Sequence, residues 1–382
     1  MGLLQSVAPF ERANSDDLAR VVFGVLGMPL DALDLKSLLQ RIDLAVEVGA
    51  PFLLSTPNVN FLMMSRSDAE FRESLLMSDL CPVDGMPLVW IARLLGIPIR
   101  ERLSGSDIFD ALRARGAPGR KLKVFLFGGG EGVAETVSET LNQEAGGMTC
   151  VGAINPGFGS IADMSTAPVF QVINASGADL LTVFLSARKA QAWLLRSHDH
   201  LDVPFRAQFG ATINLQAGTV KRAPILLQKI GLEWLWRIKE EPYLWKRYWH
   251  DGWGLISVTL SCVLPLFAHY RWRQLTGSGS DQFEMRYTEN PRSVLVSIVG
   301  AAIERHIDAA IDCFRKAIEG ENDIEIDLSN LRVIDPRFFG LLLMVRKLSI
   351  RQGFKLEFLN ATPRIKTMFR LNGFEFLLNA ER

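Results

Sequence analysis

The feature that most constrains the fold is a short apolar segment, 121–127, in which Val-Phe-Leu-Phe follow one another after Lys123. A strand that is apolar on both faces has to be covered on both faces, as the strands of parallel sheets are. Similar segments recur along the chain and alternate with segments of helical periodicity. This alternation is typical of a parallel sheet with helices on both sides, so the sequence predicts an α/β fold.

Periodicity also locates the elements of this first domain. Strands are predicted at 21–25, 51–54, 121–127, 149–154, 180–185 and 205–209. Helices are predicted at 34–48, 68–77, 88–95, 104–115, 131–143, 169–176 and 189–198. Asp68, and either Ser104 or Ser106, stand where two of these helices would be capped.

Length and composition indicate two domains. The chain has 382 residues, more than one ordinary domain, and a hydrophobic content of 48% that can supply two cores. We expect an N-terminal arm at 1–17, a larger domain at 18–250, a connecting segment at 251–280 with a Gly/Ser linker, and a smaller domain at 281–382. Lys and Arg total 42 and so do Asp and Glu, which argues against nucleic acid as a partner.

The cysteines and histidines favour a cytoplasmic protein that needs no metal. The four cysteines are far apart and form no Cys-x-x-Cys pair, as expected of reduced core residues. The five histidines lack metal-ligand spacing, and no Asp-x-Asp precedes the smaller domain. The N-terminus has no basic stretch followed by an apolar one, so no signal peptide is predicted.

Two polar loops follow predicted strands. Pro57 ends the first strand because it lacks an N–H, which leaves Thr56 and Asn58 at the edge where open α/β sheets bind ligands. Asp84 follows the next apolar run and precedes a glycine and a helix. Loops of this kind could hold an acceptor hydroxyl and a base for it. The alternative is that Asn58 and Asp84 only cap helices or form turns.

A glycine-rich segment, Gly128-Gly129-Gly130, opens the helix at 131–143. Its backbone N–H groups could face the phosphates of a nucleotide, or the segment could be only a tight turn. A dinucleotide fingerprint beginning at Gly128 fails because Val133 stands where glycine or alanine is required. A nucleotide-dependent oxidoreductase is therefore disfavoured.

Trp and Arg interleave between residues 224 and 250, a composition that suits a membrane headgroup layer or a pyrophosphate. An ordinary pair of amphipathic helices is the alternative. The following apolar run, 255–268, is 14 residues long and contains Pro265, whereas a spanning helix needs about 20. We expect an interfacial or re-entrant segment, with a spanning helix as the second possibility. The region 224–273 is thus predicted to contact a membrane surface, with the protein peripheral on the inner face of the cytoplasmic membrane.

Six segments between residues 20 and 250 resemble, in order, the signature of the WecG/TagA/CpsF family of bacterial glycosyltransferases. They are 55–60, 82–87, 101–107, 127–134, 216–224 and 231–248. The resemblance implies a Rossmann-like domain and an inverting transfer of a sugar from a nucleotide, UDP in the usual case, to a polyprenyl-diphosphate-linked sugar. The product would belong to exopolysaccharide or cell-surface polysaccharide synthesis.

The resemblance also assigns roles to residues. Asp84 would be the base, Thr56 and Asn58 would orient the acceptor sugar, and Arg102 would face a diphosphate. Contacts to the substrates are expected from Gly128, Gly129, Gly130, Lys189, Gln191, Asn214, Arg237 and Arg247. No cofactor or metal is expected, because arginine and lysine side chains bind diphosphate well.

The chain departs from the family after the strand that ends near Leu185. The family pattern there is Gly-x-Pro-Lys-Gln-Glu, and this sequence has Ser-Ala-Arg-Lys-Ala-Gln at 186–191. Only Lys189 is retained, which affects the expected donor contacts. The departure favours an alternative function, in which a degenerate transferase acts as a scaffold through its smaller domain.

The smaller domain resembles a STAS domain, the fold of anti-sigma-factor antagonists. Asp-Leu-Ser at 327–329 matches the family, but the turn at 335–340 has no serine or threonine for phosphorylation. We therefore expect a docking module that is not a phosphorylation switch, separable from the transfer chemistry. Arg337 is expected to place an exposed positive charge at the helix start for an acidic protein partner.

Overall fold

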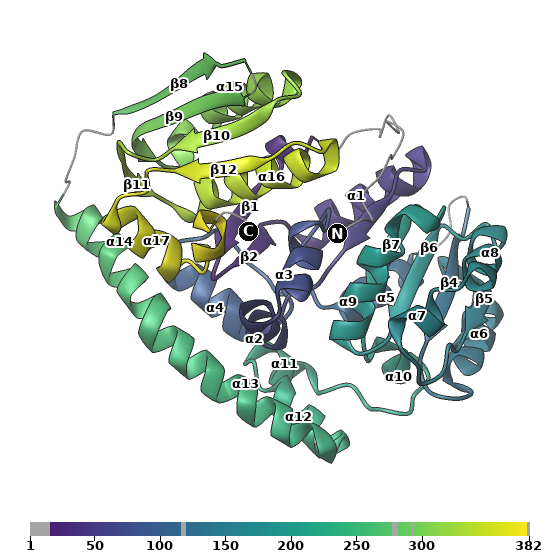
Figure 1. The fold of residues 1–382 in the computed structure, drawn as a ribbon. Helices are drawn as coiled ribbons and strands as arrows, with labels where there is room; N and C mark the ends of the chain where they lie inside the picture. The colour runs from purple at the N-terminus through teal and green to yellow at the C-terminus, as the bar shows by residue number, and fades with distance from the viewer. Residues whose placement is uncertain (1–15, 116–119, 277–281, 292, 380–382) are drawn as a thin grey trace.

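The computed structural model describes residues 16–115, 120–276, 282–291 and 293–379 (Figure 1). The predicted arm at 1–17 lies almost wholly outside the described residues, as does the Gly/Ser linker at 277–280. The larger domain is built on a five-stranded sheet of β3 (Phe52–Leu54), β4 (Leu122–Gly128), β5 (Met148–Ile154), β6 (Leu180–Phe184) and β7 (Phe205–Gln208). The strand order is β3-β7-β6-β4-β5 and every pair is parallel, which confirms the predicted fold class.

Helices cover both faces of this sheet, as the apolar segment 121–127 required. Val124 and Leu126 belong to a core with α1 (Leu35–Val48), α5 (Gly105–Ala114) and α6 (Val133–Gln143). Phe125 and Phe127 belong to a second core with α7 (Ile161–Met164), α8 (Ala167–Ala175) and α9 (Ala187–Arg196). Side chains of successive strand residues point to opposite faces, so one strand feeds both cores.

The other helices of this domain are short. They are α2 (Val59–Ser67), α3 (Ala69–Leu76), α4 (Met86–Leu94), α10 (Thr212–Gln216), α11 (Ile225–Lys229) and α12 (Glu233–Glu240). Turns of 3-10 helix occur at η1 (Asp17–Ala19), η2 (His198–His200) and η3 (Pro242–Leu244) in this part of the chain and at η5 (Glu304–His306) and η6 (Glu375–Leu378) further on. The predicted cap Asp68 accepts a hydrogen bond from the first turn of α3, and Ser104, not Ser106, does so for α5. Asp34, which was not predicted as a cap, accepts one from the first turn of α1.

The predicted strand at 21–25 exists but does not join the parallel sheet. It is β1 (Val22–Val25), which forms an antiparallel hairpin with β2 (Met28–Asp31). Leu26 and Gly27 form the turn with positive φ values of 51° and 90°. The second strand escapes prediction because it is four residues long and contains Pro29, a residue depleted in strands.

The C-terminal domain is a second, smaller α/β unit, as predicted. Its elements are β8 (Phe283–Glu289), β9 (Ser293–Ala302), α15 (Ile307–Glu319), β10 (Asp323–Asp327), β11 (Leu331–Ile334), α16 (Pro336–Gln352), β12 (Leu356–Leu359) and α17 (Pro363–Leu371). The strands follow the order β11-β9-β10-β12 with parallel pairing, and β8 pairs antiparallel with β9.

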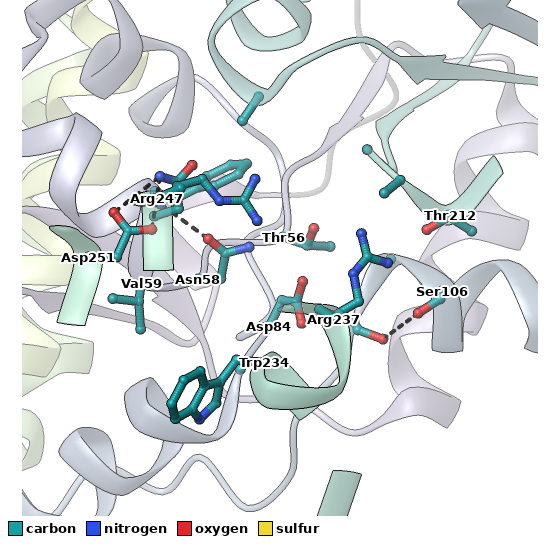
Figure 2. Close-up of a pocket in the computed structure, with 18 of the residues that line it drawn as sticks. Thr56, Asn58, Val59, Asp84, Ser106, Thr212, Trp234, Arg237, Arg247 and Asp251 are labelled. Atoms are coloured by element: carbon teal, nitrogen blue, oxygen red, sulfur yellow. Dashed lines mark hydrogen bonds between the residues drawn. The ribbon is translucent and has the colours of Figure 1, made fainter. Parts of the chain in front are cut away.

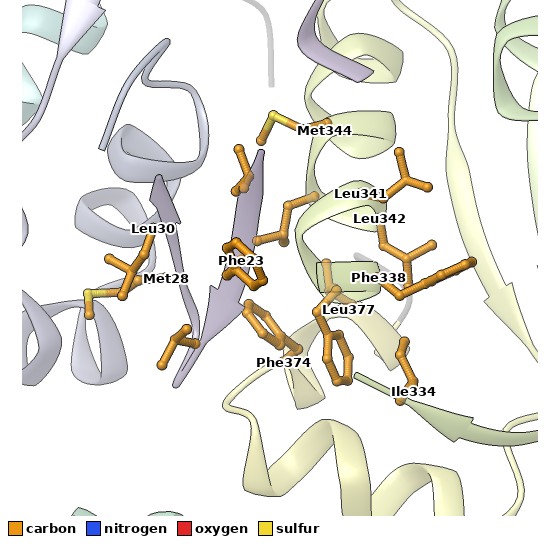
Figure 3. Close-up of a cluster of buried hydrophobic side chains, with 14 of the residues drawn as sticks. Phe23, Met28, Leu30, Ile334, Phe338, Leu341, Leu342, Met344, Phe374 and Leu377 are labelled. Atoms are coloured by element: carbon orange, nitrogen blue, oxygen red, sulfur yellow. The ribbon is translucent and has the colours of Figure 1, made fainter. Parts of the chain in front are cut away.

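The N-terminal hairpin packs on α16 of the C-terminal domain (Figure 3). Phe23 and Leu30 share one core cluster with Phe338 and Leu341, and this cluster also includes α2, α3 and α4. Gly340 sits so close to the hairpin that a Cβ there would lie 1.9 Å from the carbonyl oxygen of Val22. The two domains therefore share a core, so the C-terminal domain is not structurally independent of the rest of the protein. Its docking role and its separability from the transfer chemistry stay predictions.

Arg337 is also placed differently from the expectation. Its side chain is buried and donates a hydrogen bond of 3.2 Å to the carbonyl oxygen of Val22. The start of α16 faces the hairpin, so Arg337 does not offer an exposed charge to a partner.

A long helical segment joins the domains and runs along the outside of the molecule (Figure 1). It comprises α13 (Trp245–Val258), a π-helical turn, η4 (Thr259–Val263), and α14 (Leu264–Thr276). Pro265 follows the π-helical turn, where a proline is accommodated without reversing the chain. The re-entrant alternative is therefore wrong. By length and composition alone the helix Pro242–Arg273, 32 residues long, could cross a membrane.

Candidate active site

A cavity of about 1170 Å³ lies at the carboxyl edge of the main sheet. Loops after β3, β4, β6 and β7 line one side of it, which is where ligands bind in open α/β sheets. Helices α12 and α13 line the other side. The cavity is thus a space between the sheet domain and the start of the long helical segment.

Thr56, Asn58 and Asp84 lie together in this cavity (Figure 2). Asn58 caps α2, because its Oδ1 accepts a hydrogen bond of 3.2 Å from the N–H of Phe61. Asp84 is joined to the first loop by its backbone N–H, which donates to the carbonyl oxygen of Pro57 at 2.8 Å. The structural alternative is therefore true for Asn58, which caps a helix and lines the cavity at the same time.

The surroundings of Asp84 raise the pKa of its carboxyl to about 7. Burial is the largest cause, since it penalises the charged form, and the carboxylates of Glu233 and Asp107 act in the same direction. Arg102 and a hydrogen bond from Asn58 oppose the rise. A carboxyl group that titrates near neutral pH is suited to accept a proton during a reaction.

Arg102 lines the cavity, but two carboxylates engage its guanidinium. It forms an ion pair with Glu233 of α12 and another, at 3.1 Å, with Asp107 of α5. Arg222 also pairs with Asp107 and with Asp110. Arg102 thus connects the sheet domain to α12, and its positive charge is already balanced on the protein.

Arg237 and Arg247 enter the cavity from α12 and α13. Figure 2 shows the side chain of Arg237 beside Asp84. Arg237 pairs with Glu241 one turn further along. Arg247 is exposed and lies over the ring of Tyr248, with 4.9 Å between its Cζ and the ring centroid. Both cations therefore reach the cavity from the helices that close its outer side.

The predicted donor contacts divide into two groups. Gly129, Gly130, Lys189 and Asn214 line the cavity. Gly129 has a φ of +99°, and a Cβ there would lie 3.0 Å from the Cδ1 of Ile213, so the loop is built for glycine. Lys189 donates a hydrogen bond of 2.8 Å to the carbonyl oxygen of Gly159.

Gln191 and Gly128 do not line the cavity. The side chain of Gln191 is fully buried, and its amide exchanges hydrogen bonds with the hydroxyl of Ser55 at 2.9 and 3.2 Å. That hydroxyl lies 2.8 Å from the hydroxyl of Ser78. The prediction that Gln191 contacts a substrate is wrong in this structure, because its polar atoms support the loop that carries Thr56.

Sequence reasoning missed Asp251, which lines the cavity from α13. Asn60 donates to both of its carboxylate oxygens, at 3.3 and 3.1 Å. Burial raises the pKa of Asp251, while the hydrogen bond from Asn60 and the charges of Arg247 and His250 lower it. One signal was available, since Asp251 is the only acidic residue between positions 245 and 273. Glu233 lies in the segment 231–248 that resembles the family, but the sequence gives no sign that its carboxylate pairs with Arg102.

An exposed apolar stripe follows the outer face of the long helical segment. It consists of Trp245, Trp249, Trp253, Ile256, Leu260 and Leu264, all more than a third exposed. Spacings of three and four residues place these side chains on one side of a helix. The opposite side, with Val258, Cys262, Val263 and Leu266, is packed in the protein core. The cavity is bounded by the same helix, so its outer wall adjoins the stripe.

Within the described residues, no group of three or more His, Cys, Asp or Glu side chains is arranged to hold a metal ion. The charged groups among the described residues that line the cavity are the carboxylates and arginines named above and Lys189. The site offers a carboxyl group with a pKa near neutrality, cationic side chains opposite it and hydroxyl and amide groups between them.

Comparison with known proteins assigns a family to each of the two domains. The sequence model of the WecG/TagA/CpsF glycosyl transferase family matches residues 23–265, and the STAS domain model matches residues 284–381. The chain is similar to an N-acetylglucosaminyldiphosphoundecaprenol N-acetyl-β-D-mannosaminyltransferase of Bacillus spizizenii, 26% identical over 52% of this chain and 74% of that protein. A protein of the same name from Bacillus subtilis is 24% identical over 53% of this chain and 75% of its own length. This chain belongs to the WecG/TagA/CpsF family of glycosyl transferases.

Proposed function

We propose that this protein transfers a sugar from a nucleotide sugar to a polyprenyl-diphosphate-linked sugar, with inversion at the transferred carbon. The observation that carries the proposal is Asp84, whose carboxyl has a pKa of about 7 in a cavity that also presents Thr56, Asn58 and Arg237. Asp84 accepts the proton of the acceptor hydroxyl, and the oxygen attacks the anomeric carbon of the donor. The bond from that carbon to the diphosphate breaks, and the nucleoside diphosphate leaves.

Charge on the leaving diphosphate needs positive side chains close to it. Arg237 and Arg247 reach the cavity from the helical side, and Lys189 and the Gly129-Gly130 loop line it on the sheet side. This division supports a donor bound between the two walls, with the diphosphate neutralised by protein cations. We propose UDP as the nucleotide and no requirement for a metal ion.

The acceptor is proposed to reach the site from a membrane surface. The apolar stripe is exposed, contains three tryptophans and is accompanied by Lys246, Arg271 and Arg273 on the same helical segment. An aromatic and cationic helix with one face packed on protein is suited to lie in the headgroup layer. We propose a peripheral location on the inner face of the cytoplasmic membrane and a product used in exopolysaccharide or other cell-surface polysaccharide synthesis.

The scaffold alternative is less well supported. It rested on the altered segment 186–191. In that segment the buried amide of Gln191 binds Ser55, in the loop that carries Thr56, and Lys189 still lines the cavity. A protein partner of the C-terminal domain remains part of the proposal only for surfaces other than the hairpin-covered side of α16.

The test is a transfer assay with purified full-length protein. It uses UDP-N-acetylmannosamine and other nucleotide sugars with a short-chain polyprenyl-diphosphate N-acetylglucosamine, because the similar proteins are named for that acceptor and that sugar. Formation of a lipid-linked disaccharide with an inverted linkage is the expected result. Absence of product across the donor panel, with a relative as positive control, would favour the scaffold.

A further inference from the structure

A buried cluster of charged groups joins α16 of the C-terminal domain to the sheet domain. Three cations pair with three carboxylates in it: Arg20, Lys347 and Arg351 with Asp17, Asp31 and Asp79. The side chain of Lys347 is fully buried in the cluster. Burial of a charge is tolerated where it is paired and hydrogen-bonded, so the cluster fixes how α16 sits on the other domain.

Lys347 makes the central contacts. Its Nζ lies 2.7 Å from Oδ1 of Asp79 and 3.1 Å from Oδ1 of Asp17, and it donates to the carbonyl oxygen of Ser78 at 3.1 Å. Arg351, one turn along α16, bridges the same two carboxylates at 2.7 and 2.9 Å. Lys347 and Arg351 of the C-terminal domain thus bind the chain at Ser78 and Asp79.

From Asp79 the chain runs directly to Asp84, and hydrogen bonds join this segment to the one that carries Thr56. The Oδ2 of Asp79 accepts a hydrogen bond of 2.8 Å from the N–H of Leu53, in the strand that leads to Thr56. The N–H of Ser55 then donates to the carbonyl oxygen of Leu80 at 3.0 Å. At the far end, the N–H of Asp84 donates to the carbonyl oxygen of Pro57. Segments 53–58 and 79–84 are therefore joined from the ion cluster to the cavity.

We propose that Lys347 is a positioning residue for the transfer reaction, because through Asp79 it sets the relative position of the two segments that carry Thr56 and Asp84. The C-terminal domain is then part of the transferase and not an attachment to it. The expected effect of Lys347 on turnover rests on the proposed function. Its expected effect on the positions of segments 53–58 and 79–84 does not. A displacement of about 1 Å in a reacting group can lower a rate on the order of a hundredfold.

The test uses the full-length chain with Lys347→Met, which keeps the length of the side chain and removes its ammonium group. We expect kcat to fall on the order of tenfold or more, with little change in KM for the nucleotide sugar. Lys347→Arg restores the charge and should recover most of the loss. The matched control is Arg346→Met, the neighbouring cation on α16, which pairs at 2.8 Å with Glu73 of α3. This control should retain kcat even if it lowers the melting temperature.

Hydrogen exchange gives a readout that does not need activity. Backbone amides in 52–58 and 79–84 should exchange faster in Lys347→Met than in the wild type or in Arg346→Met. Unchanged exchange, or a kcat equal to that of Arg346→Met, would overturn the proposal. If the wild type transfers no sugar, the proposed function fails, and exchange still decides whether Lys347 anchors the segments. Should Lys347→Met not fold, Arg351→Met replaces it, since Arg351 binds the same carboxylates and is 20% exposed.

Discussion

Asn60 and Asp251 form a two-pronged hydrogen bond, with the amide nitrogen 3.3 and 3.1 Å from the carboxylate oxygens, and it joins α2 to α13 at the cavity. A hydrogen bond to a charged group contributes about 1.5–3 kcal/mol. It holds the long helical segment against the loop that carries Asn58. The contact lies at the cavity, where α13 forms part of the wall.

Asn60→Asp places a second carboxylate against Asp251, and the two like charges repel. We expect kcat/KM for the lipid-linked acceptor to fall on the order of tenfold or more at pH 8. The double variant Asn60→Asp with Asp251→Asn restores one amide and one carboxylate in exchanged places and should regain most of the activity. A double variant no better than Asn60→Asp would show that the pair has no role in closing the cavity.

Asp84→Asn keeps the shape of the side chain and removes the base. Turnover should fall on the order of a hundredfold or more while the fold is retained. Circular dichroism and the elution volume of the variant provide the control for folding. Near-normal turnover would remove Asp84 from the mechanism.

The pH dependence follows from the raised pKa of Asp84, about 7. The base acts in its ionised form, so kcat/KM of the wild type should fall as pH drops below about 7 and level off above it. Stability has the opposite dependence, because an aspartate in the unfolded chain titrates near 3.9 and the folded form resists ionisation. Between about pH 3.9 and pH 7 the free energy of unfolding therefore decreases as pH rises. The melting temperature of Asp84→Asn should therefore exceed that of the wild type most clearly above pH 7, and a constant difference from pH 4 to 8 would contradict this.

Activity is expected without a divalent metal. Arg237, Arg247 and Lys189 already bring positive charge to the cavity, where it can balance a diphosphate. Enzyme treated with a chelator and assayed in its presence should keep its rate. A loss of rate that magnesium or manganese restores would show that the substrates bring a metal into the site.

The apolar stripe is expected to hold the protein on anionic membranes. Trp249 and Leu260 are 64% and 62% exposed on it. Trp249→Glu with Leu260→Glu should lower the fraction that sediments with anionic liposomes tenfold or more, since burial of each large apolar side chain contributes about 1.5–3 kcal/mol. Ile350→Glu, at a position 41% exposed on α16, is the matched control. Equal sedimentation of both variants would contradict a membrane role for the stripe.

Local sequence signals were sufficient for most of the fold. Alternating apolar segments located the parallel sheet, and Pro57 marked the strand end that carries Thr56 and Asn58. The pairing of β1 was not predictable in this way, because its site is fixed by α16 more than 300 residues away in the sequence. No local pattern could report that distant contact.

The candidate site shows the same division. Asp84 was singled out because a carboxylate after a short apolar run is a local signal, and its role as the base came from the resemblance to the glycosyltransferase family. Gln191 was misassigned because its amide is hydrogen-bonded to Ser55, from another part of the fold, whose hydroxyl in turn bonds that of Ser78. Asp251 was missed because its partner, Asn60, lies 191 residues earlier. Residues that act through distant partners need the three-dimensional structure to be recognised.

The packing of the hairpin on α16 also dictates the order in which the chain can mature during synthesis. Val22 leaves the ribosome 315 residues ahead of Arg337, the residue that binds its carbonyl group. At about 5–20 residues per second, the hairpin waits roughly 15–60 seconds for its partner. During that interval the side of the hairpin that packs on α16 is uncovered, so the hairpin completes its packing only after α16 has been made.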